Sequence, residues 1–224
     1  MKLSPLALPI FILVSTLGLS GCIIHVGGNN HVSDDEDLNR VFGDIEVSAY
    51  RHVDDVSSVN GNIELQHEVS AEDVETVNGN IDLGQQVSLT SLSTVNGEIT
   101  AEAGLRVSQD VSTVNGDISL TKDSQVQQGI SSVNGDVLLN NVTVGKDVET
   151  VNGDITLSSG SLVEGDIIFR SNDDNRWQNS KQLPTLKIDT SSSVAGKIIL
   201  QRNVILEIDN AELLSKVERQ YSQK

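Results

Sequence analysis

Thr113-Val114-Asn115-Gly116-Asp117-Ile118 is the stretch of sequence that decides the fold, because versions of it recur along the chain. The tripeptide Val-Asn-Gly occurs six times, and successive copies are 18 or 19 residues apart. A degenerate copy, Val41-Phe42-Gly43-Asp44-Ile45, precedes the first by 18 residues. A repeat of this length is typical of a stacked architecture, in which each unit buries its apolar side against its neighbours. The repeated asparagine–glycine pairs are Asn60-Gly61, Asn78-Gly79, Asn96-Gly97, Asn115-Gly116, Asn134-Gly135 and Asn152-Gly153.

Two folds compete for this repeat. Asn-Gly between apolar runs is a strong signal for a two-residue hairpin turn, which would give antiparallel hairpins. Alternatively, each unit is one coil of a parallel β-solenoid, with equivalent residues stacked about 4.8 Å apart. Coils stacked in register require the same residue type at the same position, whereas a hairpin requires only alternation. One such position is held by Ile45, Ile63, Ile81, Ile99, Ile118, Val137 and Ile155, and another by Val47, Leu65, Leu83, Ala101, Leu120, Leu139 and Leu157. We therefore predict an all-β chain, a parallel β-solenoid with coils of about 18 residues.

The glycine position persists where the asparagine is missing, at Gly43, Gly165 and Gly196. Glycine is therefore expected to meet a backbone requirement, either a positive φ or a close approach at a tight corner. The asparagines could stack amide on amide in a hydrogen-bonded ladder, which is a structural role rather than a binding role.

The C-terminal part departs from the repeat. Repeats are expected over residues 41–170, a polar insertion over 171–183, and terminal coils with a cap over 184–224. The cap would shield the open end of the solenoid from strand addition.

The N-terminus reads as an export signal. Lys2 is followed by a mostly apolar run that is too short to span a membrane, so residues 1–21 are expected to be a signal peptide. The junction Leu19-Ser20-Gly21-Cys22 resembles the lipobox of bacterial lipoproteins. That resemblance implies that Cys22 is acylated and becomes the mature N-terminus, and Ile23 after it implies the outer membrane. The alternative is a buried structural cysteine beside an ordinary signal peptide.

Residues 22–40 form the expected flexible acidic tether between the lipid and the solenoid. His25 and His31 lie in it, but two histidines without a third ligand make a weak metal signal. The chain has a formal net charge of −17, which argues against nucleic acid and anionic membrane surfaces as partners. A single cysteine excludes an internal disulfide.

Catalysis finds little support in the sequence, and neither an enzyme activity nor a cofactor is expected. The insertion carries Asp173, Asp174, Arg176 and Trp177, which could bind a sugar, although Trp177 fits better as a plug for the end of the solenoid. The residue after each repeat glycine could build a column of carboxylates that binds calcium. Its members would be Glu98, Asp117, Asp136 and Asp154. A solvated acidic stripe is the favoured interpretation of this column, because calcium-binding solenoids usually repeat a denser acidic motif.

The segments Thr113–Ile118 and Thr150–Ile155 resemble the repeats of a bacterial domain family labelled as adhesins, whose activity is unknown. The match covers roughly residues 41–170. Gly165-Asp166-Ile167 and Gly196-Lys197-Ile198 are similar to bactofilins, which assemble end to end through uncapped solenoids. The chain departs from bactofilins in its lipid anchor and its insertion.

The uninterrupted repeat, the expected tether and the lack of a catalytic set favour a non-enzymatic, lipid-anchored scaffold or adhesin-like interaction surface of the cell envelope. It would face the periplasm or the exterior, with an envelope protein or polysaccharide as partner. The alternatives are a bactofilin-like polymer and a polysaccharide-active enzyme.

Overall fold

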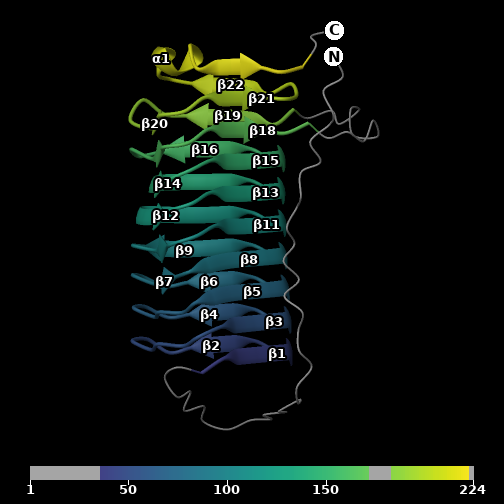
Figure 1. The fold of residues 1–224 in the computed structure, drawn as a ribbon, viewed down its shortest axis with the longest axis vertical. Coiled ribbons are helices and arrows are strands. Elements are labelled where there is room, and N and C mark those ends of the chain that lie inside the picture. The colour runs from purple at the N-terminus through teal and green to yellow at the C-terminus, as the bar shows by residue number, and fades with distance from the viewer. Residues whose placement is uncertain (1–35, 172–182, 222–224) are drawn as a thin grey trace, which may run out of the picture. The chain divides into compact units, whose positions relative to one another are not determined.

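The structure is a computed structural model that describes residues 36–171 and 183–221, and these residues wind into a stack of β-coils (Figure 1). Within them, strands form one sheet of ten and one of thirteen. The ten-stranded sheet contains, in spatial order, β1 (Leu38–Phe42), β3 (Val56–Asn60), β5 (Asp73–Asn78), β8 (Ser91–Asn96), β11 (Val111–Asn115), β13 (Ile130–Asn134), β15 (Val148–Asn152), β18 (Ile167–Phe169), β21 (Ile198–Leu200) and β23 (Val217–Arg219).

The thirteen-stranded sheet forms the opposite side of each coil. Its main path is β2 (Ile45–Val47), β4 (Ile63–Leu65), β6 (Ile81–Leu83), β9 (Ile99–Ala103), β12 (Ile118–Val126), β14 (Val137–Val144), β16 (Ile155–Ser158), β19 (Thr185–Ile188) and β22 (Ile205–Ile208). Beside this path lie the short strands β7 (Ser88–Leu89), β10 (Arg106–Val107), β17 (Leu162–Val163) and β20 (Ser193–Val194).

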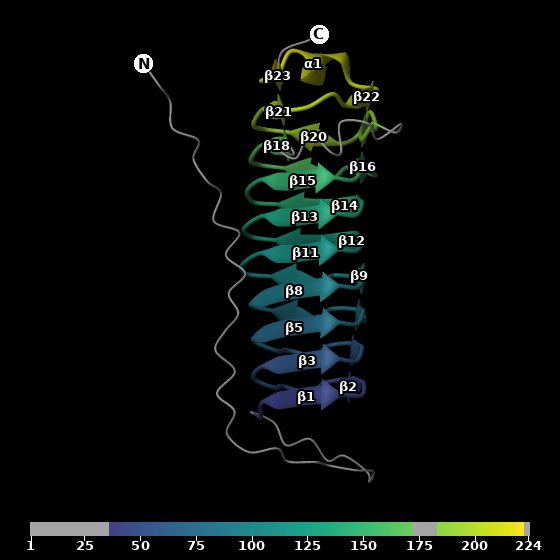
Figure 2. The same cartoon turned by 90° about the vertical axis from the view of Figure 1, so that its right-hand side faces the viewer.

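The register confirms the parallel solenoid and rules out the hairpin alternative. Every strand pairing in the described residues is parallel, and the repeats pair position for position: Asn115 lies beside Asn96 and Asn134, and Ile118 beside Ile99 and Val137. Figure 2 shows the strands of the ten-stranded sheet following one another in the same direction. The stack begins at Leu38, three residues earlier than the repeat pattern indicates and inside the segment expected to be tether.

The core is a narrow column of aliphatic side chains. The strands of the thirteen-stranded sheet read buried–exposed–buried, so Ile63 and Leu65 point inward while Glu64 points out. The side chains that stack with Ile63 in the seven coils, and those that stack with Leu65, are at most 5% exposed. Complete burial of each such side chain contributes roughly 1.5–3 kcal/mol.

The valine of Val-Asn-Gly faces outward, which the sequence pattern does not indicate. The inward position before it is held by a hydroxyl residue that is at most 4% exposed, and in three coils this hydroxyl donates to a glycine carbonyl of the preceding corner. Thr76 Oγ1, for example, lies 3.1 Å from the oxygen of Gly61. The bond satisfies a polar group that would otherwise be costly to bury. The column contains Ser58, Thr76, Thr94, Thr113, Ser132 and Thr150.

The repeat glycines meet the requirement of close approach. A Cβ added at any of the six Val-Asn-Gly glycines would lie 1.8–2.1 Å from the carbonyl oxygen of the glycine one coil earlier. The closest such approach would be at Gly97, 1.8 Å from the oxygen of Gly79. No side chain fits there, so the main chains of successive coils touch at this corner.

The assignment of Gly165 and Gly196 to this glycine column is wrong. Ile167 pairs with Val148 and Ile198 pairs with Ile167, all in the ten-stranded sheet, whereas the residues after the repeat glycines start strands of the other sheet. Gly165 and Gly196 therefore lie at the corner that precedes the ten-stranded sheet.

A second corner has left-handed backbone without requiring glycine. Positive φ recurs here every 18 or 19 positions, in the turn after the main strand of the thirteen-stranded sheet or, in two coils, inside β12 and β14. Positive φ also occurs at Gly43, Gly116, Gly135 and Gly160, outside this series. The members of the series are Tyr50, Glu68, Gln86, Gly104, Asp123, Asn141 and Ser159. Because six of the seven carry a side chain, the corner leaves little trace in the sequence.

In the chain order, the insertion connects β18 of the ten-stranded sheet with β19 of the other sheet, a connection that Asn-Gly makes in the earlier coils. Asp189 ties the chain after the insertion to the stack by accepting hydrogen bonds from Ser159 N at 2.7 Å, Ser191 Oγ at 2.9 Å and Ser192 N at 2.8 Å. Partial burial opposes ionisation of the Asp189 carboxyl, but these hydrogen bonds outweigh it and lower its pKa to about 2.

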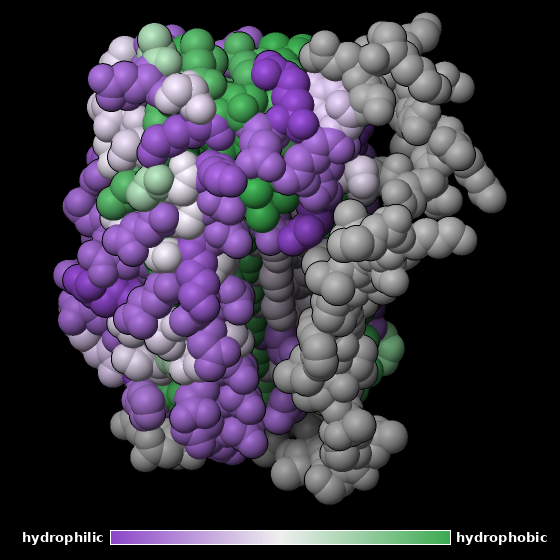
Figure 3. All heavy atoms as spheres, turned by 45° about the horizontal axis from the view of Figure 1, so that its top comes forward, coloured by the Kyte–Doolittle hydropathy of each residue, from purple (hydrophilic) through white to green (hydrophobic). Residues whose placement is uncertain are grey.

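The chain ends with α1 (Ala211–Leu214) and β23. The side chain of Asn210 caps the helix N-terminus, and Leu213 is 3% exposed in the core. Figure 3 shows hydrophobic side chains at the C-terminal end of the stack, where Ile205 and Leu214 are 45% and 49% exposed. The cap over this end stays a prediction. No helix in the described part of the chain has the length and apolar character that crossing a membrane needs.

The glycine corner gives a first prediction. Gly97→Ala forces a methyl group against a main-chain oxygen that side-chain motion cannot move, so unfolding should become easier by about 3 kcal/mol or more. Gly160→Ala is the control: its φ of 88° is unfavourable for alanine, but the added methyl meets nothing within 4 Å, so the cost should be about 1–2 kcal/mol. Urea unfolding of both variants measures the difference, and equal losses would contradict the close-contact explanation.

Candidate functional site: the outer face of the ten-stranded sheet

The repeat asparagines form a continuous ladder on the outer side of the ten-stranded sheet. Each amide donates from Nδ2 to the Oδ1 of the asparagine one coil earlier, over distances of 2.8–3.0 Å. The ladder expected from the sequence is therefore present. Its members are Asn60, Asn78, Asn96, Asn115, Asn134 and Asn152.

The ladder has a direction and a distinct group at each end. At the first coil Asn60 Nδ2 donates to the carbonyl oxygen of Val41 at 3.3 Å. At the last, Arg202 Nη1 donates to Asn152 Oδ1 and to the carbonyl oxygen of Val151, both at 2.6 Å. Since all the amide dipoles point the same way, the accepting end carries partial negative charge, and a guanidinium there is favourable. Burial lowers the pKa of Arg202 from its ordinary value.

Arg202 was not identified from the sequence. It lies 50 residues from Asn152 and belongs to the corner between β21 and β22, two coils further along. In the intervening coil Ser171, two residues after Phe169, stands where the earlier coils carry an asparagine, and the arginine reaches past it. No local pattern marks this contact.

A column of valines runs beside the asparagine ladder. These side chains are partly exposed, with Val77 at 40% and Val41 at 54%. On their other side lies a column that is mostly serine and glutamate, including Ser93 and Glu75. The outer face therefore presents the same three kinds of side chain in coil after coil. The valine column contains Val41, Val59, Val77, Val95, Val114, Val133 and Val151.

The residues after the repeat glycines do stack, and several of their side chains accept hydrogen bonds from main-chain N–H groups of the next coil. Asp117 Oδ1 accepts from the main-chain N–H of Asp136 at 2.7 Å, Asp136 from Asp154 at 2.8 Å, and Asp154 from Thr185 at 2.7 Å. Asn80 accepts in the same way from Glu98. In residues 36–171 and 183–221, no group of three or more His, Cys, Asp and Glu side chains is arranged to hold a metal ion. Of the column Glu98, Asp117, Asp136 and Asp154, the three aspartates therefore act as acceptors for main-chain N–H groups, whereas Glu98 takes part through its own main-chain N–H, which donates to Asn80.

A parallel column, which the sequence analysis missed, lies at the corner before the ten-stranded sheet. Asp110 accepts from Gly129 N at 2.8 Å, Asp147 from Asp166 N and Asp166 from Lys197 N, both at 2.7 Å. The signal is an aspartate directly before the first apolar residue of the strand.

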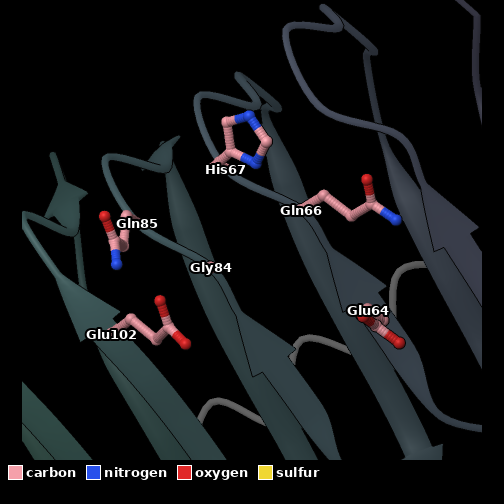
Figure 4. Close-up of a pocket in the computed structure, with 6 residues that line it drawn as sticks. All are labelled: Glu64, Gln66, His67, Gly84, Gln85 and Glu102. Atoms are coloured by element: carbon pink, nitrogen blue, oxygen red, sulfur yellow. The ribbon is translucent and has the colours of Figure 1, made fainter.

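A shallow hollow lies on the other sheet, where Gly84 lacks a side chain (Figure 4). It is lined by Glu64, Gln66, His67, Gly84, Gln85 and Glu102, which come from three successive coils. Gln66 Nε2 donates to Glu46 Oε1 at 2.6 Å. The hollow offers hydrogen bonds to a polar molecule, but it interrupts the repeat and spans few coils.

The remaining sequence-predicted residues lie outside the described parts of the chain. They are Leu19, Ser20, Gly21, Cys22, His25, His31, Asp173, Asp174, Arg176 and Trp177. Comparison of the chain with protein-family models, with curated proteins and with solved structures finds no match.

The asparagine ladder gives the second prediction. Asn115→Ala removes two exposed hydrogen bonds that water can replace, so it should cost about 1 kcal/mol. Asn115→Asp should cost more at pH 7, because its carboxylate faces Asn96 Oδ1 with no proton to donate. Below about pH 4, where an ordinary aspartate is protonated, the additional loss of stability of Asn115→Asp relative to Asn115→Ala should become smaller. Thermal melts of both variants against pH measure this, with Asn140→Asp on the other sheet as control. Equal losses for the three variants would contradict a cooperative ladder.

Proposed function

We propose that the protein is a non-enzymatic interaction scaffold of the bacterial cell envelope, with an adhesin-like surface on the ten-stranded sheet. The observation that carries this proposal is the repetition of one outer face over six coils, with hydroxyl or carboxylate, valine and asparagine columns side by side. A partner that is itself repetitive would find an equivalent site at every coil. Weak contacts made at many coils then add up to firm attachment.

The chemistry of this face favours a polysaccharide or an extended protein segment as the partner. Each asparagine keeps one Nδ2 proton and one oxygen lone pair outside the ladder, so it both donates and accepts. The neighbouring valines supply apolar contact. Hydroxyl groups and apolar ring faces of a sugar chain match this combination.

The distribution of charged side chains limits which classes of polymer could bind. Between residues 36 and 105 the chain carries fourteen Asp and Glu but two basic side chains, Arg40 and Arg51. Such a field repels polyanions, which argues against nucleic acid and favours a neutral or cationic polymer as the partner.

Membrane attachment through Cys22 completes the proposal. The lipobox-like junction Leu19-Ser20-Gly21-Cys22 supports acylation, and two or more acyl chains hold a protein on a bilayer stably. The solenoid would then project from the outer membrane.

A second candidate, end-to-end assembly like that of bactofilins, is favoured by the first coil. Strand β1 is the edge of the ten-stranded sheet, and on it Phe42 is 78% and Val41 54% exposed. The third reading, a polysaccharide-active enzyme, depends on Asp173 and Asp174, which lie outside the described residues.

The anchor gives the third prediction. Cys22→Ser removes the expected acylation site and precedes the first coil, which begins at Leu38, so the variant should stay folded and leave the membrane fraction. Fractionation of cells followed by circular dichroism of the released protein checks both parts. Retention in the membrane after a high-salt wash would show that another element makes the attachment.

The interaction surface gives the fourth prediction. A photo-crosslinking residue placed at Val77, 40% exposed on the ten-stranded sheet, should capture an envelope polymer or protein in intact cells. The same probe at Leu138, 43% exposed on the other sheet, is the matched control and should capture less. Equal capture at both positions would contradict the proposed face.

Two outcomes with the purified protein would favour the alternatives. Sedimentation as filaments would support end-to-end assembly. Turnover of an envelope polysaccharide that Asp173→Asn abolishes would support the enzyme.

A further inference from the structure

The six Asn-Gly pairs share a chemical liability that is independent of the proposed function. When the main-chain nitrogen after an asparagine attacks the side-chain carbonyl carbon, Cγ, the side chain loses ammonia. A following glycine presents no side chain to hinder the attack. Asparagine is accordingly counted among the thermolabile residues. The solenoid therefore repeats a reactive dipeptide six times in nearly identical surroundings.

Five of the six pairs are restrained in the same two ways. The glycine N–H donates to the main-chain oxygen of the asparagine in the next coil, at 2.9–3.1 Å, which occupies the attacking nitrogen. The asparagine Oδ1 accepts from the neutral amide of that same residue. The restrained glycines are Gly61, Gly79, Gly97, Gly116 and Gly135.

In the part of the chain that the structure describes, the sixth pair, Asn152-Gly153, lacks the hydrogen bond from the glycine N–H, and its asparagine Oδ1 accepts from a different group. Ser171 holds the position beside Asn152 in the next coil, and within the described residues Gly153 N–H donates to no main-chain carbonyl. Asn152 Oδ1 accepts instead from the guanidinium of Arg202 at 2.6 Å.

The guanidinium of Arg202 makes the side-chain carbonyl carbon of Asn152 more electrophilic. A charged donor on Oδ1 draws electron density from Cγ and stabilises the oxyanion that forms when nitrogen attacks. The same cation donates to the carbonyl oxygen of Val151 at 2.6 Å, so it is held in place by a second contact. A nitrogen without that hydrogen bond in the described residues and a carbonyl that accepts from a cation thus occur together at one pair of the six.

We propose that Asn152 is a site of selective self-modification, in which Arg202 promotes deamidation. Gly153 N loses its proton and bonds to Asn152 Cγ, the Cγ–Nδ2 bond breaks, and ammonia leaves with that proton. The resulting five-membered imide is opened by water, which gives an aspartate or an isoaspartate. The new carboxylate lies beside Arg202 as an ion pair, and the ladder loses the bond from Asn152 Nδ2 to Asn134 Oδ1.

Peptide mapping of the purified full-length protein, incubated folded at pH 7, tests the proposal with five internal controls. The mass gain that marks replacement of amide nitrogen by oxygen should accumulate at Asn152 several-fold faster than at any of the other five asparagines. In concentrated urea, where the restraints are gone, the six rates should converge. Folded rates that are equal, or slowest at Asn152, would overturn the proposal. A preference for Asn152 that persists unchanged in urea would also overturn it, because the cause would then be local sequence.

Substitutions at Arg202 isolate the role of the charge. Arg202→Met should slow the reaction at Asn152 several-fold, and Arg202→Lys should restore most of the rate because it keeps a cation near Oδ1. Circular dichroism melts of both variants confirm that the comparison is between folded proteins. An unchanged or faster reaction at Asn152 in Arg202→Met would overturn the assignment of the guanidinium.

Discussion

The contact between glycine main chains at the Asn-Gly corner is the constraint on which the rest of the structure depends. A hypothetical Cβ would lie 1.8–2.1 Å from the carbonyl oxygen of the glycine one coil earlier, so this close contact restricts the height and register of each coil relative to its neighbour. The asparagines before the glycines must then lie one above another, as must the carboxylates and amides after them. The ladder, the main-chain acceptor columns and the regular outer face all follow from that corner.

The fold could be predicted from the sequence because its signals are periodic. The columns through Ile118 and Leu120 keep their residue type over seven units, and parallel stacking is the arrangement that makes such constancy necessary. The choice between positive φ and close approach could not be made, since glycine satisfies both. The structure shows close approach at all six Val-Asn-Gly glycines, and positive φ at only two of them, Gly116 and Gly135. Positive φ on residues with side chains, such as Gln86 and Asp123, occurs at another corner.

The errors in the sequence analysis have a physical origin as well. Gly165-Asp166-Ile167 was assigned to the wrong corner because the same residue types make the same kind of main-chain hydrogen bond at two corners of the coil. At both, an aspartate directly before a strand accepts a hydrogen bond from the main chain of the next coil, as Asp117 does at one and Asp147 at the other. A short motif of glycine, acid and isoleucine therefore fits either. The outward valine was missed for a related reason: a buried threonine such as Thr76 is tolerated where a glycine carbonyl accepts its hydroxyl proton.

The equivalent coils and the coil at which the repeat is interrupted have different properties. Where the coils are equivalent, no single residue is distinctive, and the outer face can act only through the sum of many like contacts. Where the insertion breaks the series, equivalence ends and an individual environment arises. Asn152 is chemically the same residue as Asn134, yet it has a cation in place of an amide and a glycine neighbour without the bond that the others make. Distinctive chemistry in such a solenoid is therefore expected at the coil where the asparagine ladder stops. Sequence periodicity alone cannot identify the partner of Asn152 there, because Arg202 lies 50 residues further along the chain.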